Sequence, residues 1–250
     1  SDIGNVELTD CAHELGTSRA GNISLCFTLC HSSSFPYLKG VYVRFYLAST
    51  SPARLATLRS SGIEPVVVPS EVDEDAAVAA AEAAAGGALA PAEMVQLLAQ
   101  AKAEAVLNSE IDGLVLGGDS AFVLDGVTYG KPHTPEVALE RWQKQRGRTG
   151  QLFSGHWMID HRGGQLNSAV GEVTVAEVTF SSDISDAELE AYISSGEPLK
   201  VAGAFTIDSL GAAFIDRIEG DPSTVVGVSV PALRRMAGKL DVFWPELWNK

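Results

Sequence analysis

A short junction at residues 49–54 places several groups that suit anion binding within six positions. Its sequence, Ser-Thr-Ser-Pro-Ala-Arg, follows an apolar run over residues 41–48 that predicts a buried strand. Ser51 suits a helix N-cap and Pro52 the first helical position, so the free N–H groups of this helix would point back toward the strand end. Such a helix end binds anions, and Arg54 would add a cation there against the helix dipole. The alternative is an ordinary turn with a solvated arginine.

Two carboxylates and a lysine further along the chain suit metal and phosphate chemistry. Asp119 follows an apolar run and two glycines, where a strand end would present it at the carboxyl edge of a sheet. Lys131 follows a predicted hairpin at 125–126 and is expected to return near Asp119. Glu74, in an acidic cluster, would supply a second carboxylate to Mg²⁺. The structural alternatives are a turn former, a surface lysine and a solvated acidic loop.

Other reactive residues lack the partners that their chemistry needs. His156 lies in an expected strand, but the sequence has no Gly-x-Ser-x-Gly nucleophile elbow to go with it. The P-loop pattern and the Gly-x-Gly-x-x-Gly dinucleotide pattern are also absent from the sequence. The three cysteines, all within the first 30 residues, have no standard zinc-ligand spacing. The absence of these patterns argues against a hydrolase with a nucleophile elbow, a P-loop protein and a Rossmann protein.

Composition narrows the classes of protein and ligand. The chain has 250 residues, enough for one extended α/β domain or two small lobes, with 46% hydrophobic and 20% charged residues. The formal charge of −14 argues against a surface that binds a nucleic-acid polymer, although a small anion remains compatible with locally gathered cations and a divalent metal. No run approaches the roughly 18 apolar residues that span a bilayer. We therefore expect a cytoplasmic protein without a membrane segment.

Apolar runs and helical patterns alternate from residue 41 onward, which predicts an α/β fold. Strands are expected at 41–48, 64–69, 114–118, 151–160, 166–180 and 212–218. Helices are expected at 52–61, 91–108, 134–146, 187–194 and 231–240, and the alanine-rich stretch 76–90 is a broken helix or a mobile loop. Residues 1–40 lack this periodicity, so we expect a poorly ordered N-terminal extension before a domain that spans 41–250.

Seven blocks of sequence resemble the Maf family of nucleoside triphosphate pyrophosphatases. They are LASTSPAR at 47–54, SEVDED at 70–75, LLAQAKA at 97–103, LVLGGDS at 114–120, GKP at 130–132, SGEPLKVAGAFTIDSLGAAF at 195–214 and GDPSTVVGVSVP at 220–231. The resemblance implies hydrolysis of the α–β phosphoanhydride of a nucleoside triphosphate to a monophosphate and pyrophosphate, with Mg²⁺ or Mn²⁺, in a house-cleaning role. It also implies a curved mixed sheet with flanking helices, two lobes around a central cleft, and a homodimer.

The resemblance assigns roles to residues of this sequence. Asp119 becomes the catalytic proton acceptor, and Glu74 and Asp119 hold the metal. Substrate binding falls to Ser49, Ser51, Arg54, Lys102, Lys131 and Asp208.

Two departures from the family pattern bear on the substrate. Ala53 stands where many members have an arginine, and Asp208 stands where the members resembling the dTTP- and UTP-preferring type have glutamine. A carboxylate only accepts hydrogen bonds, whereas an amide also donates them, so base recognition should differ. The substrate is left as a common pyrimidine or modified nucleotide. Two rival functions are a non-enzymatic nucleotide-binding regulator of cell division and septum formation, and a phosphatase that removes only the γ phosphate.

Overall fold

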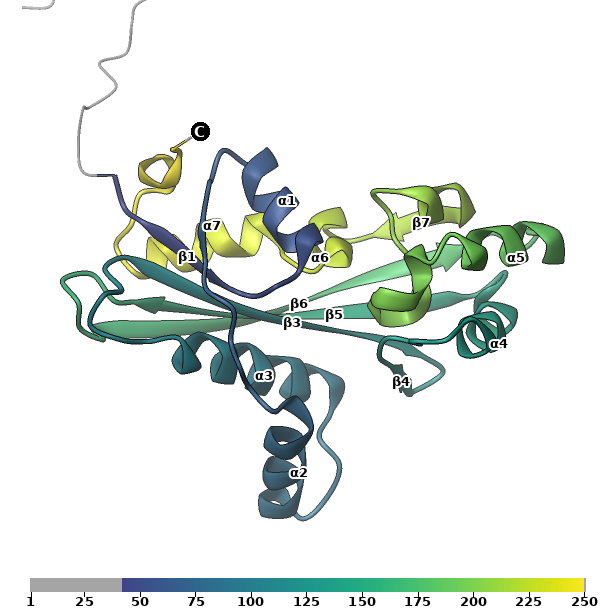
Figure 1. Ribbon diagram of the computed structural model, residues 1–250, viewed down its shortest axis with the longest axis horizontal. Coiled ribbons are helices and arrows are strands. Elements are labelled where there is room, and N and C mark those ends of the chain that lie inside the picture. Colours follow the sequence, from purple (N-terminus) through teal and green to yellow (C-terminus); the bar gives the residue numbers. More distant parts are fainter. Residues whose placement is uncertain (1–41, 250) are drawn as a thin grey trace, which may run out of the picture. The chain divides into compact units, whose positions relative to one another are not determined.

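An open mixed sheet forms the centre of the fold in the computed structural model, which describes residues 42–249 (Figure 1). The strand order is β2-β1-β3-β5-β6-β7, and β4 pairs with β3. β1 lies parallel to β2 and β3, whereas the other pairs are antiparallel. The strands are β1 Phe45–Ala48, β2 Val66–Val67, β3 Leu114–Leu124, β4 Val127–Tyr129, β5 Thr149–Asp160, β6 Ser168–Phe180 and β7 Ile215–Glu219. The predicted mixed α/β architecture is confirmed.

The helices begin where the sequence supplies capping side chains and prolines. The α-helices are α1 Pro52–Ser60, α2 Glu74–Ala85, α3 Pro91–Ala105, α4 Pro135–Gln145, α5 Asp186–Ser194, α6 Pro222–Val226 and α7 Val230–Lys239. Short 3₁₀ helices follow at η1 Glu197–Lys200, η2 Ala202–Ala204, η3 Leu210–Phe214 and η4 Trp244–Leu247. Ser51, Thr134 and Ser185 accept hydrogen bonds from first-turn amides, as expected for N-caps.

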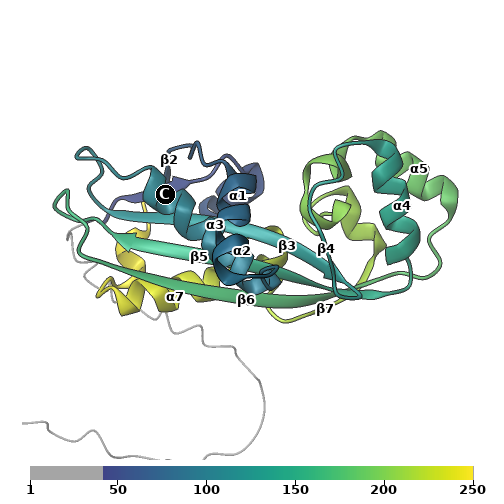
Figure 2. The same ribbon diagram turned by 90° about the horizontal axis from the view of Figure 1, so that it is seen from below.

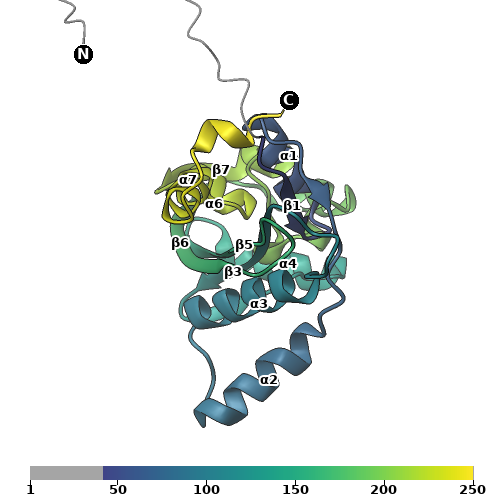
Figure 3. The same ribbon diagram turned by 90° about the vertical axis from the view of Figure 1, so that its left-hand side faces the viewer.

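Helices cover both faces of the sheet. Figure 1 shows α3 on one face and α1, α6 and α7 on the other, and Figure 3 shows α2 beyond α3 on the side away from the sheet. α3 lies so close that a side chain at Gly117 or Gly155 would clash with the carbonyl oxygens of Ala99 and Val95. The two glycines therefore let this helix rest directly on β3 and β5.

Two hydrophobic cores lie on the same side of the sheet at different points along the long strands. One packs β1 against α7, with Phe45, Leu116 and Met236 at its centre. The other is aromatic and joins Phe122 and Phe180 to residues of α4 and α5 through edge-to-face ring contacts. Figure 2 shows β4, α4 and α5 gathered at the far end of the strands from α1 and α7. The expected central cleft between lobes stays a prediction.

Several sequence-based boundaries were wrong. β1 begins at Phe45, so residues 42–44 of the strand expected at 41–48 lie outside it, and α3 ends at Ala105 rather than at residue 108. β3 does not end at Gly118 but continues through Asp119 to Leu124, because its glycines serve close packing rather than a turn. Within the stretch 76–90, residues 76–85 are neither broken nor a loop, because they belong to a continuous helix, α2, which begins at Glu74 and is capped by Gly86 in the left-handed conformation; residues 86–90 then connect it to α3. The last strand begins at Ile215 because residues 212–214 form part of η3. The strand expected at 64–69 is only Val66–Val67.

The expectation for residues 1–40 lies outside the described residues. Within the described range, 42–249, no helix is both long enough and apolar enough to cross a membrane.

Candidate functional site

β1 and β4 pair with the same edge of β3 and leave a gap between them. β1 pairs with residues 114–117 and β4 with residues 122–124, while β5 pairs along the opposite edge over residues 114–123. Residues 118–121 therefore have a strand neighbour on one side only. We call this stretch the notch. The predicted site residues can be placed relative to it.

Arg54 reaches the notch from the first turn of α1. The chain leaves β1, and Ser51 caps the helix by accepting a hydrogen bond from the Arg54 amide at 3.4 Å. The Arg54 guanidinium then donates from Nη1 to Ser49 Oγ at 3.2 Å, from Nη2 to Ser120 Oγ at 3.0 Å and from Nε to the Gly227 carbonyl at 2.8 Å. Three separate N–H groups thus fix the orientation of this cation.

A chain of hydroxyl groups holds the acceptor beneath Arg54. Ser120 Oγ lies 3.0 Å from Ser154 Oγ, which donates to the Thr224 carbonyl at 2.8 Å. Burial lowers the pKa of Arg54, whereas the charges of Asp119 and Glu74 raise it. An arginine in this setting keeps its charge because its ordinary pKa lies above 12. The notch therefore contains a fixed positive charge.

Lys102 joins the two carboxylates that the sequence assigned to a metal. Its Nζ, on α3, lies 2.7 Å from Asp119 Oδ1 and 2.8 Å from Glu74 Oε1. The Lys102 and Asp119 side chains are 10% and 14% exposed, whereas Glu74, the first residue of α2, is 52% exposed. Glu74 belongs to a helix start rather than to a solvated loop. Two carboxylates thus converge on one cation beside the notch.

This pair of carboxylates fits a divalent metal that shares its coordination with a substrate. Mg²⁺ is usually held by one or two carboxylates, with waters and substrate phosphates completing the coordination. Glu74 Oε1 and Asp119 Oδ1 both lie within 2.8 Å of Lys102 Nζ, so the two carboxylates are close enough to share one cation. Among residues 42–249 no group of three or more His, Cys, Asp and Glu side chains could hold a metal by itself, so a metal here would need ligands from a substrate or water.

The acid and the arginine approach the notch from opposite faces of β3. Side chains alternate along a strand, so Gly117 and Asp119 point toward α3. Gly118 and Ser120 point toward Arg54, and a β-carbon at Gly118 would lie 3.3 Å from Arg54 Nε. A ligand that contacts both charges must therefore lie at the unpaired edge itself.

Lys131 and Asp208 are not brought into contact with these groups. Lys131 follows β4, which runs back along β3 with Tyr129 opposite Phe122, so the chain heads toward the notch. Its side chain is exposed and forms no hydrogen bond or ion pair with residues 42–249. Asp208 lies in an exposed segment before η3 and likewise has no such partner in that range. Their assigned roles stay predictions.

His156 has a structural place rather than a catalytic one. The residue is fully buried, and its Nε2 accepts a hydrogen bond from the Ser229 amide at 2.9 Å. Its Nδ1 lies 3.1 Å from the Glu172 carbonyl and therefore carries the ring proton. Burial lowers the pKa of His156 to about 4, so the ring is neutral near pH 7. The neutral ring supports the amide at the start of α7.

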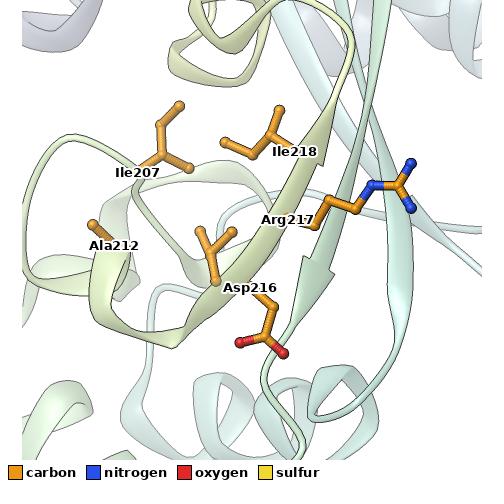
Figure 4. Close-up of a pocket in the computed structure, with 6 residues that line it drawn as sticks. Ile207, Ala212, Asp216, Arg217 and Ile218 are labelled. Atoms are coloured by element: carbon orange, nitrogen blue, oxygen red, sulfur yellow. The ribbon is translucent and has the colours of Figure 1, made fainter.

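A separate pocket of about 240 Å³ lies beside β7 (Figure 4). None of the predicted site residues lines it. Arg217 points away from the isoleucines, and Asp216 accepts a hydrogen bond from Ser181. Because it lacks convergent charged groups, this pocket is a poor candidate for the site. Its lining residues are Ile207, Ala212, Ile215, Asp216, Arg217 and Ile218.

Sequence reasoning missed the residues that hold the arginine and the lysine in place. Ser120, Ser154 and Gly227 support Arg54, yet they lie 66, 100 and 173 residues from it along the chain. The pairing of Lys102 with both carboxylates was also missed. The only available signal was that Ser120 and Gly227 fall inside blocks shared with the Maf family.

The fold and these contacts define a class: a mixed α/β protein whose cations and carboxylates, most of them largely buried, lie around an unpaired strand edge, an arrangement suited to a polyphosphate ligand. The chain belongs to the Maf family, since the family model described as Maf-like protein matches residues 44–240.

Several relatives are similar over most of their length. A protein of Leifsonia xyli subsp. xyli is 67% identical over 212 residues, covering 83% of this chain and 98% of the relative. A Nocardia farcinica protein is 48% identical, covering 81% and 95%, and a Corynebacterium diphtheriae protein is 46% identical, covering 81% and 97%. Each of the three is named nucleoside triphosphate pyrophosphatase.

Proposed function

We propose that this chain hydrolyses the α–β phosphoanhydride of a nucleoside triphosphate and releases a nucleoside monophosphate and pyrophosphate. Membership of the Maf family and the names of its relatives support this activity. The observation that carries the proposal is the convergence of Arg54, Lys102 and Asp119 on the notch. The substrate is a common pyrimidine or modified nucleotide, and the protein acts in the cytoplasm as a homodimer.

Arg54 binds the phosphates in an orientation that is set before the substrate arrives. Its hydrogen bonds to Ser49, Ser120 and the Gly227 carbonyl hold the guanidinium against the notch. A charge fixed in advance needs no reorganisation when negative charge develops on the leaving pyrophosphate. The N-terminus of α1, which begins at Pro52, adds backbone N–H groups of the same polarity. Lys131 adds a further cation from the end of β4.

Asp119 accepts the proton of the attacking water. Its Oδ1 accepts a hydrogen bond from Lys102, whereas its Oδ2 has no hydrogen-bond partner among residues 42–249 and is the oxygen that takes the proton. Lys102 holds this carboxylate in place. Glu74 and Asp119 would hold Mg²⁺ or Mn²⁺, which neutralises phosphate charge when it is bound. With Glu74 engaged by the metal, Lys102 would be free to contact a substrate phosphate while still holding Asp119.

The test is a turnover assay that detects pyrophosphate and orthophosphate separately. We expect wild type to release pyrophosphate, and Asp119→Asn to lower kcat by about a thousandfold with an unchanged circular dichroism spectrum. Asp125→Asn is the matched control, because Asp125 lies at positive φ in the β3–β4 turn, where asparagine is also tolerated. A wild-type rate in Asp119→Asn would refute the catalytic assignment.

The same assay separates the rival functions. A nucleotide-binding regulator would bind nucleoside triphosphates without releasing either product. A γ-phosphatase would release orthophosphate and a diphosphate. The molar mass measured by light scattering during size-exclusion chromatography tests whether the protein is a homodimer.

A further inference from the structure

Glu197, the first residue of η1, is the centre of a hydrogen-bond cluster that no proposed catalytic step uses. Its carboxylate accepts five hydrogen bonds. The donors are the hydroxyls of Tyr192, Thr206 and Ser209 and the backbone amides of Leu210 and Gly211. Four of these five donors belong to the segment 206–211, which we call the Glu197 loop. One side chain thus determines the conformation of this loop.

The Glu197 loop is wrapped tightly around the carboxylate. A side chain at Gly211 would lie 2.5 Å from the Tyr192 hydroxyl and 2.6 Å from the Thr206 carbonyl, so only glycine fits there. Burial alone would raise the pKa of Glu197, but hydrogen bonds from the loop lower it to about 2. The carboxylate is therefore ionised at every pH at which the protein would be assayed, and the five donors remain satisfied.

The chain entering this loop lies on the same face of β3 as Arg54. Ser120, which binds Arg54, and Phe122 are two residues apart and point to one face, about 7 Å apart along the strand. A β-carbon at Gly203 in η2 would lie 2.7 Å from Phe122. η2 is fixed by Trp142 Nε1, which donates to the Ala204 carbonyl at 2.8 Å. η2, which leads into the loop, thus packs against Phe122, two residues along β3 from Ser120.

Asp208 is the charged residue that the loop presents. Thr206, two residues before it, and Ser209, the residue after it, are bonded to Glu197, whereas the Asp208 carboxylate is exposed and has no hydrogen bond or ion pair to residues 42–249. Asp208, the charged residue of the loop, therefore lies between two residues that are hydrogen-bonded to Glu197. A nucleotide whose phosphates contact Arg54 would extend its nucleoside toward this part of the same face.

We propose that Glu197 is a positioning residue, which holds the Glu197 loop so that Asp208 meets the base of the bound nucleotide. This inference rests on the proposed function. Because a carboxylate only accepts hydrogen bonds, Asp208 selects a base edge with N–H donors, such as the N3–H of uridine or the exocyclic amine of cytidine. Glu197 acts on this selection only through Asp208.

The test is a double-mutant cycle read as selectivity. The selectivity is the ratio of kcat/KM for UTP to that for N3-methyl-UTP, which lacks the N3–H donor, or the ratio for CTP to N4-dimethyl-CTP. Of these two ratios, the one to follow is that of the nucleotide which wild type hydrolyses better. We expect Asp208→Ala to lower this ratio by about tenfold and Glu197→Gln to lower it by a similar factor, chiefly through KM. In the Asp208→Ala background, Glu197→Gln should change the ratio no further.

Controls separate positioning from general loss of stability. Glu188→Gln removes a carboxylate that bonds Ser185 in the capping box of α5, and it should leave the ratio unchanged. Ser209→Ala removes one donor of the loop and should lower the ratio in the same direction even where Glu197→Gln folds poorly. Unaltered selectivity in both loop variants, or additive effects with Asp208→Ala, would overturn the inference.

The outcomes also distinguish this inference from the proposed function. A wild-type protein that releases no pyrophosphate from any nucleoside triphosphate refutes the proposed function together with this inference. A wild-type protein that releases pyrophosphate, with selectivity that ignores Glu197, refutes the positioning role alone.

Discussion

Replacing Lys102 by methionine tests the charge cluster beside the notch. Methionine keeps the unbranched, apolar stem but removes the ammonium that lies 2.7 Å from Asp119 and 2.8 Å from Glu74. A hydrogen bond to a charged group contributes about 1.5–3 kcal/mol when buried, and an exposed one contributes little. Asp119 is 14% exposed and Glu74 52% exposed, so most of the loss comes from Asp119. We therefore expect Lys102→Met to lower the free energy of unfolding by about 2 kcal/mol.

For a chain of this size that loss lowers Tm by about 4–8 °C. Calorimetry should also show that Mn²⁺ raises the Tm of Lys102→Met more than that of wild type, because a divalent cation can replace the missing ammonium between the two carboxylates. Lys144→Met is the control, since it removes a surface lysine paired with Glu140, and it should respond to Mn²⁺ as wild type does. A Lys102→Met variant with wild-type Tm, or one that Mn²⁺ does not stabilise further, would refute this reasoning.

Two further predictions concern Arg54 and His156. Arg54→Lys keeps the charge, but its compact ammonium cannot reach the three separate acceptors that the planar guanidinium spans. We therefore expect KM for the nucleotide to rise about tenfold in steady-state assays, and an unchanged KM would count against its role. The folded pKa of His156, about 4, lies below its ordinary value of 6.5, so the unfolded chain binds more protons as pH falls through 6.5. Urea unfolding should therefore show a loss of about 2 kcal/mol between pH 7.5 and 5 that is absent in His156→Gln; equal losses in both proteins would contradict it.

Short sequence patterns correctly predicted the start of a helix and the position of a turn, because both depend on residues that are close together in the chain. The capping serine and proline that open α1 and the Asp125-Gly126 turn between β3 and β4 lie where the sequence indicated. Both depend on backbone geometry within four residues, which short patterns encode well.

Glycines misled the prediction where they serve tertiary packing. Gly117 and Gly118 suggested a strand end, but one makes room for α3 and the other for Arg54 while β3 continues past both. Gly86 and Gly87 suggested a broken helix, yet Gly86 simply ends α2. A glycine that permits close approach and a glycine that permits a turn cannot be distinguished in a single sequence.

The convergence of the site could not be predicted from local patterns at all. It depends on where β1 stops and β4 starts along one edge of β3, which is a matter of strand register. Lys102 lies 28 residues from Glu74 and 17 from Asp119, so no periodicity links them. The resemblance to the Maf family indicated which residues matter, and the structure shows which of them touch.

The proposed function requires that one polyphosphate and its metal bind at the notch. A crystal structure with Mn²⁺ and an α,β-methylene nucleoside triphosphate, whose scissile bridge cannot be hydrolysed, tests this directly. We predict an anomalous manganese peak between Glu74 and Asp119 and phosphate density against Arg54 and the N-terminus of α1. Nucleotide density elsewhere, such as in the pocket beside β7, with Lys102 still bridging both carboxylates, would show that the notch is not the substrate site.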